Sequence, residues 1–169
     1  MWQQNRLINF GGNAPRESRI GEGQTTTTMI SFNNEDISFI LKNKTILKQW
    51  INEVIQHKKR KTGAINFIFC SDDFLLDINK KYLDHDTLTD IITFDYSKEN
   101  PKQAISGDIF ISIDRIKENA QKFSKTFENE LHRVMIHGVL HLLGYTDKTK
   151  LSKAEMTKQE DQCLKVLKT

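Results

Sequence analysis

Residues 135–148 read MIHGVLHLLGYTDK and place two histidines four positions apart within an apolar run. Positions four apart lie one turn above each other on an α-helix, so His137 and His141 are expected to direct their rings at one point. Gly144 favours a tight or left-handed exit from the helix, which lets the chain reverse and bring Asp147 back beside the histidines. The stretch therefore predicts three ligands for one metal ion, with a fourth tetrahedral position left open, as in catalytic zinc sites.

The same helix also admits two other interpretations. A single histidine on a half-buried helix is often an ordinary polar residue, but two at this spacing, followed by Gly144 and Asp147, favour a metal site. The spacing also occurs in the metzincin proteases, HExxHxxGxxH, where the glutamate after the first histidine is the general base. Gly138 takes that place here, which argues against peptide hydrolysis.

The rest of the chain alternates between strand and helix patterns. Strands are expected at 29–32, 64–71, 89–97 and 108–113. Helices are expected over 46–55, from a cap at Ser71 or Asp72 through Tyr82, over 114–123 and 127–143, and through Met156 and Cys163 near the end. This order predicts an α+β fold, a small mixed β-sheet packed with helices, with the metal site on the long helix and the following turn.

The first 28 residues differ from the rest, because they contain three arginines and no lysine, follow no helix or strand period, and end in a threonine run. We expect residues 1–28 to be a disordered leader or a non-native extension outside the fold. A basic arm that folds on RNA is the alternative. Residues 29–169 then form a single domain, which fits a chain of 169 residues.

Composition limits the classes of function. Cys70 and Cys163 are far apart, which does not indicate a disulfide framework and fits a reducing, cytoplasmic setting. No apolar run approaches the roughly 20 residues that a membrane span needs. The formal net charge is only +3, so nucleic-acid binding would require a local basic face.

Three stretches together resemble one known family. HGVLHLLGYTD (137–147) resembles the HGxLHLxGYDH signature of the YbeY family of bacterial metal-dependent endoribonucleases. NKKYLDHDTLTDIITFDY (79–96) resembles that family's N-x-x-Y-R-x-x-D-x-P-T-D-V-L-S-F segment, and GDIFIS (107–112) resembles its GDI strand. The resemblance covers nearly everything from Met29 to about Asp147.

The resemblance implies a single-strand-specific endoribonuclease that acts in maturation of the 3′ end of small-subunit (16S) rRNA and in ribosome quality control. It further implies one Zn²⁺ ion as cofactor, ribosomal RNA and the small ribosomal subunit as partners, and a cytoplasmic location. Zinc would polarise a phosphoryl oxygen while lysine and arginine hold the backbone. Two histidines and a carboxylate also suit iron(II), and zinc is preferred only because of the resemblance.

The sequence departs from the family pattern at three positions. The third histidine is replaced by Asp147, which is still a competent zinc ligand, and the aspartate before it is Thr146. The arginine expected after Tyr82 is Leu83, so another basic group must contact phosphate.

Two replacements for that arginine are available. Arg133 lies one turn before His137, although it could instead form an ordinary helix pair with Glu130 or another carboxylate. The second candidate is the run Lys58, Lys59, Arg60 and Lys61, which could instead offset the helix macrodipole.

The second family stretch adds two possible supporting residues. His85 and Asp90 could assist proton transfer or orient a metal ligand, and Asp90 could equally be a cap. His132 falls on a different helix face from His137 and is expected to be structural. Two other functions remain open: a metalloprotease-like hydrolase, and a non-catalytic ribosome-associated factor whose metal only holds the Gly144 turn.

Overall fold

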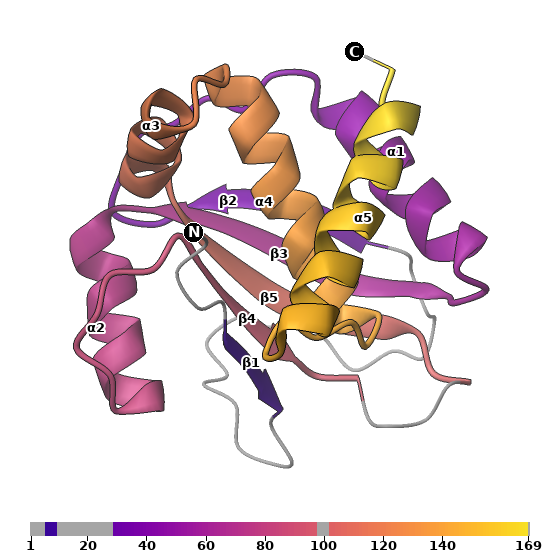
Figure 1. Ribbon diagram of the computed structural model, residues 1–169, viewed down its shortest axis with the longest axis horizontal. Helices are drawn as coiled ribbons and strands as arrows, with labels where there is room; N and C mark the ends of the chain where they lie inside the picture. Colours follow the sequence, from indigo (N-terminus) through magenta and orange to yellow (C-terminus); the bar gives the residue numbers. More distant parts are fainter. Residues whose placement is uncertain (1–5, 10–28, 98–101, 169) are drawn as a thin grey trace.

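The strands form one mixed sheet in the computed structural model, which describes residues 6–9, 29–97 and 102–168 (Figure 1). The strands are β1 (Arg6–Asn9), β2 (Met29–Asn34), β3 (Thr62–Cys70), β4 (Ile91–Asp95) and β5 (Ile105–Ser112). Their order across the sheet is β1-β4-β5-β3-β2. The β4–β5 pair is antiparallel and the other pairs are parallel, which confirms the predicted mixed sheet.

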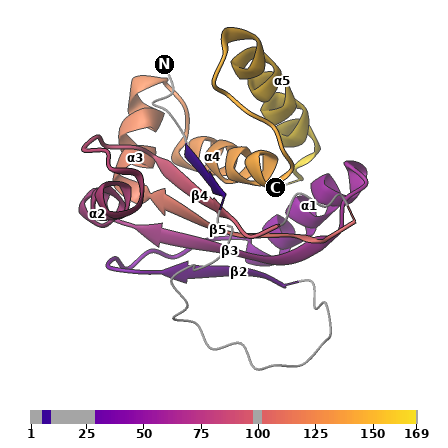
Figure 2. The same ribbon diagram turned by 90° about the horizontal axis from the view of Figure 1, so that it is seen from below.

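The helices pack on both faces of this sheet. They are α1 (Lys44–His57), α2 (Asp72–Leu83), α3 (Ile113–Lys122), α4 (Phe127–Leu142) and α5 (Lys150–Val166). α4 lies between the sheet and α5, as Figure 2 shows. None of the helices in this part of the chain combines the length and apolar content that crossing a membrane requires.

Alternation along the strands divides the core into two clusters. Ile91 and Ile109 face the larger cluster, which includes side chains of α1, α3, α4 and α5. Ile92 and Phe94 face a smaller cluster closed by α2. Successive strand residues point to opposite faces, so this division follows from the apolar character of both faces of β4. Helix α4 is consequently held against the centre of the sheet.

Close packing fixes the height of α4 above the sheet. A Cβ atom on Gly138 would lie 2.8 Å from Ile109 Cγ2 and 3.0 Å from Ile91 Cδ1. Only a glycine therefore fits here without a shift of the Ile109 and Ile91 side chains. The position after His137 faces the sheet, so a general base of the metzincin kind has no room there.

The predicted elements from Met29 onward are all present, with ends that differ by a few residues. Ser71 caps α2, because its hydroxyl accepts a hydrogen bond from the Phe74 N–H at 3.2 Å. Strand β5 begins at Ile105, three residues before the predicted position 108.

The structure differs from the sequence prediction at β1. We expected residues 1–28 to lie outside the fold, whereas Arg6–Asn9 pairs in parallel with β4, from Arg6 opposite Ile92 to Asn9 opposite Asp95. The physical reason is that β4 would otherwise end the sheet with unpaired backbone groups. The rest of the predicted leader, residues 1–5 and 10–28, lies outside the described residues.

Candidate metal centre

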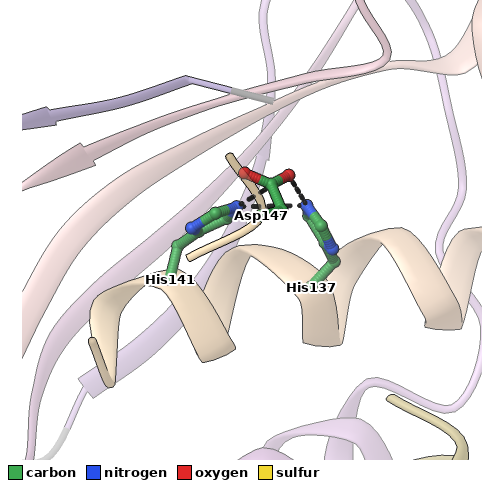
Figure 3. A group of neighbouring side chains, drawn as sticks. All are labelled: His137, His141 and Asp147. Atoms are coloured by element: carbon green, nitrogen blue, oxygen red, sulfur yellow. Dashed lines mark hydrogen bonds and ion pairs between the residues drawn. The ribbon is translucent and has the colours of Figure 1, made fainter. Parts of the chain in front are cut away.

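The three predicted ligands meet at one point (Figure 3). His137 Nε2 and His141 Nε2 are 3.1 Å apart on successive turns of α4. Asp147 Oδ2 is 3.5 Å from His137 Nε2 and 3.6 Å from His141 Nε2. Within the described residues, no other group of three or more histidines, cysteines or carboxylates converges in this way.

These distances fit one small divalent ion. Zinc binds histidine nitrogen and carboxylate oxygen at roughly 2.0–2.2 Å with tetrahedral geometry, so neighbouring ligand atoms should be about 3.3 Å apart. The three observed separations lie on both sides of that value. The donor set therefore fits zinc, with three ligands from the chain and one position open.

Gly144 produces the turn that returns Asp147 to the histidines. Its φ is +96°, a left-handed conformation that residues with a Cβ rarely adopt. The Gly144 N–H donates to the His141 carbonyl at 2.9 Å, and the Tyr145 N–H donates to the Leu140 carbonyl at 3.0 Å. This pair of bonds is a Schellman motif, so the glycine ends α4 and reverses the chain as expected.

The ring nitrogens that face away from the ligand point each have a partner. His137 Nδ1 lies 2.5 Å from Glu160 Oε1, and His141 Nδ1 lies 2.9 Å from the Tyr145 carbonyl. Since carbonyl and carboxylate oxygens accept, Nδ1 carries the hydrogen in both rings. Each Nε2 thereby faces the ligand point and can bind a metal ion when the ring is neutral, the arrangement typical of metal-bound histidines.

Glu160 was missed in the sequence analysis. It comes from α5, and only 3% of its side chain is exposed. A signal was present, because Glu160 lies four residues after Met156 and three before Cys163, on the apolar face of the helix. A carboxylate on such a face indicates a buried and partnered group.

Arg133 holds Glu160 and does not face the ligand point. Its Nη1 is 2.9 Å from Glu160 Oε2, and its Nη2 is 2.7 Å from Asp161 Oδ1. The expected pairing with a carboxylate is therefore present, with Glu160 and Asp161 as partners in place of Glu130. With both terminal nitrogens engaged, Arg133 is a positioning residue for the Glu160–His137 pair.

The ligand side chains bias each other's protonation in the metal-free protein. Burial lowers the pKa of His137, but bonds to Asp147 and Glu160 outweigh it and raise the pKa to about 9. Burial raises the pKa of Asp147, whereas bonds to His137 and His141 lower it to a net value well below the usual range. Asp147 is thus an anion at neutral pH, and His137 carries a proton that a metal must displace.

Two further carboxyl groups that interact with the residues of this site, Asp90 and Glu130, are buried. Burial raises the pKa of Asp90 to about 6, although the charge of His137 lowers it. Burial, followed by the charge of Asp90, raises the pKa of Glu130 to about 7. Asp90 accepts a long hydrogen bond from Asn119 Nδ2 at 3.4 Å. Asp90 is therefore close enough to influence His137 but does not join the ligand group.

Three other residues considered from the sequence lie away from the ligands. His85 is exposed, and its backbone N–H donates to the Asn79 carbonyl. Leu83 packs against the smaller core cluster, so the family's arginine position is filled by an apolar contact. His132 meets the Trp50 ring at 6.2 Å between centroids with a tilted, edge-on geometry, which fits a structural role.

The basic run after α1 divides into two pairs. Lys58 and Arg60 are half-buried and line a cavity of about 310 Å³ with Leu143, Gly144 and Tyr145. Lys59 and Lys61 are exposed and do not line it. The structure therefore brings two of the four predicted cations to the turn that returns Asp147 to the histidines.

Comparison with known proteins agrees with this description. The family profile described as Endoribonuclease YbeY matches residues 27–168. A protein of that name from Flavobacterium psychrophilum is 51% identical over 138 residues, which cover 82% of this chain and 96% of the relative. Another, from Amoebophilus asiaticus, is 52% identical over 126 residues, 75% of this chain and 84% of the relative.

A solved structure is also similar. The solution structure of a protein from Thermotoga maritima aligns with a TM-score of 0.54 and 28% sequence identity. The alignment covers 81% of this chain and 90% of that one.

Proposed function

The chain belongs to the Endoribonuclease YbeY family, and on this premise we propose that it is an endoribonuclease that cleaves single-stranded RNA with one zinc ion. His137, His141 and Asp147 would hold the ion. The observation that carries the proposal is the convergence of their three ligand atoms at separations of 3.1, 3.5 and 3.6 Å. Small-subunit ribosomal RNA, at its 3′ end, is the proposed substrate, and the cytoplasm is the proposed location.

A bound zinc ion would supply a Lewis acid that polarises a phosphoryl oxygen and stabilises the negative charge of the transition state. The chain's own residues prepare the site for this role. Glu160 and the Tyr145 carbonyl each hold the Nδ1 hydrogen of one histidine, which keeps both Nε2 atoms directed at one point. Asp147 adds a negative charge and, at 14% exposure, lies on the more open side of the centre.

Two observations count against the alternative functions. A protease with this helix needs a general base after the first histidine, and Gly138 packs there against the sheet. A purely structural zinc ion is normally enclosed by four protein ligands. The described residues provide a group of three, which favours a reactive centre.

Cleavage of a defined single-stranded RNA by the purified full chain tests the proposal. We expect cleavage that stops when a chelator removes the metal and returns with added zinc, and that is lost in His137→Ala and His141→Ala. Iron(II) is added back in parallel to identify the metal, and casein serves as the protease substrate. Cleavage of casein, or metal binding without cleavage of RNA, would overturn the proposal.

A precursor of small-subunit rRNA tests the finer part of the proposal. We expect the purified protein with zinc to cut it near the 3′ end, on the free RNA or on the small-subunit particle. Cuts distributed evenly along the precursor in both forms would leave a general endoribonuclease and remove the assignment to the 3′ end.

A further inference from the structure

The cavity beside the metal centre combines features that the metal ligands do not use. Lys58 comes from the end of α1, Arg60 from the segment after it, and Gly144 and Tyr145 from the turn after α4. The same turn carries Asp147, and the Tyr145 carbonyl accepts the hydrogen bond from His141 Nδ1. Whatever occupies the cavity is therefore next to the metal ligands.

The two cations in the cavity differ from Arg133 in their surroundings, although the charge of Arg60 acts on the Asp95 carboxylate, whose pKa is raised by burial and lowered by this charge. Within the described residues, neither Lys58 nor Arg60 forms a salt bridge, whereas Arg133 lies against two carboxylates. Lys58 Nζ donates to the neutral Gln159 side chain at 2.5 Å. Arg60 makes a long bond, at 3.5 Å, to the Gln103 carbonyl, and no described residue is a hydrogen-bond partner of its buried Nε. Two half-buried cations whose side-chain hydrogen bonds, among the described residues, go to neutral groups leave positive charge available for an anion.

An aromatic ring and open backbone complete the cavity. Lys58 Nζ lies 5.3 Å from the centre of the Tyr145 ring. A Cβ atom added to Gly144 would meet nothing within 4 Å, so the backbone is accessible there. An aromatic ring next to a lysine and an arginine is the combination with which proteins bind single-stranded nucleic acid, where bases stack on rings and phosphates contact Lys and Arg.

We propose that this cavity, lined by Lys58, Arg60 and Tyr145, binds one nucleotide of the RNA strand next to the phosphate that is cleaved. The inference rests on the proposed function and deepens it. The base stacks on the Tyr145 ring, and the phosphate lies between the two cations. A base in a duplex is already stacked and paired, so the subsite accounts for a preference for single strands. The cavity also replaces the phosphate contact that Leu83 cannot make.

Four variants of the basic run test the phosphate contacts. Lys58→Gln and Arg60→Gln remove the cavity cations, while Lys59→Gln and Lys61→Gln remove the same charge from exposed neighbours. Binding of a 5′-labelled single-stranded RNA to the full chain is measured by fluorescence anisotropy with chelator present, so that nothing is cleaved. We expect each cavity variant to bind about tenfold more weakly. The slope of the logarithm of the binding constant against the logarithm of the salt concentration should also be shallower by about 0.7. The exposed variants should stay within about twofold.

A pair of variants at Tyr145 tests stacking. Tyr145→Phe keeps the ring and should bind RNA like the unmodified chain, whereas Tyr145→Leu should bind about five- to a hundredfold more weakly and discriminate less against duplex RNA. Both retain the backbone carbonyl that holds His141, so zinc stoichiometry checks that the turn is intact. If the leucine variant does not fold, the cation variants decide the result alone.

The outcomes separate this inference from the proposed function. Equal binding by all four charge variants would overturn the subsite, even if the protein cleaves RNA. An unmodified protein that fails to cleave RNA with zinc would overturn the proposed function, and anisotropy would still show whether the cavity binds a strand.

Discussion

Glu160 is the residue on which the orientation of the His137 ring depends. Glu160→Gln keeps the size of the side chain but removes the charge that accepts from His137 Nδ1 and from Arg133. We expect zinc affinity to fall about 10- to 100-fold, as for other partners of metal-bound histidines. Competition with a zinc-binding dye measures the change. Asp161→Asn is the control, because Asp161 also pairs with Arg133 but does not contact His137. Equal losses of zinc affinity in both variants would show that the effect comes from the pairing with Arg133 and not from the contact between Glu160 and His137.

The raised pKa of His137 predicts that zinc binding releases a proton. The metal-free ring is protonated below a pKa of about 9, and a ligand to zinc must be neutral. Between about pH 7 and pH 9 the affinity should therefore rise about tenfold per pH unit, and it should level off above that range. Calorimetry at pH 7.5 in buffers of different ionisation enthalpy should give about one proton per ion. Release of no proton would mean that His137 is neutral before zinc binds.

Helix α4 depends on one glycine for its contact with the sheet. Gly138→Ala improves helix propensity by about 1 kcal/mol. It also places a Cβ atom 2.8 Å from the buried Ile109 Cγ2. Overpacking of this kind costs about 1–3 kcal/mol, so we expect a net loss of about 1 kcal/mol in the free energy of unfolding, measured by urea denaturation. Adding Ile109→Ala makes room, and the double variant should lose less than the sum of the two single changes. Additive losses would show that the two positions do not clash.

Strand β1 extends the sheet without contributing to the metal centre. A chain that begins at Met29 retains every ligand and Glu160, so it should bind zinc with unchanged affinity. It also exposes the edge of β4, which should lower Tm by a few degrees and favour self-association. Thermal unfolding and light scattering measure both effects. Loss of zinc binding on removal of residues 1–28 would contradict the independence of the centre from β1.

The elements that could be predicted are those whose signals lie within one short segment of the sequence. The strands and helices from Met29 onward follow from periodicity and caps within each segment, as at Ser71, and the ligand triad follows from helix spacing and Gly144. Glu160 and β1 could not be predicted with their partners. Their contacts depend on how α5 crosses α4 and on which strand ends the sheet, and both are set by residues far apart in sequence.

At the scale of the whole molecule, the candidate metal centre lies between α4 and α5, and the end of α1 reaches the turn that follows α4. Two ligands come from α4, the buried carboxylate comes from α5, and Lys58 follows α1. Helices α1 and α5 are tied together, because Trp50 Nε1 donates to the Cys163 carbonyl at 2.9 Å and Lys58 reaches Gln159. A metal that joins α4 to its following turn is thus coupled to the packing of the whole helical layer.

This coupling predicts that zinc stabilises the entire fold. An ion that binds only the folded chain adds about 2.7 kcal/mol when its free concentration is a hundred times Kd. For a chain of this length, Tm should rise by roughly 5–10 °C in a thermal scan, since 1 kcal/mol corresponds to about 2–4 °C. Asp147→Ala removes one ligand while leaving α4 and its core contacts intact. Its metal-free Tm should fall, because the bonds from Asp147 to His137 and His141 are lost. The zinc-dependent rise is therefore compared within each protein, and most of it should disappear in the variant. A full rise in the Asp147→Ala protein, together with full zinc stoichiometry, would remove Asp147 from the site and leave the two histidines to bind the ion with another group.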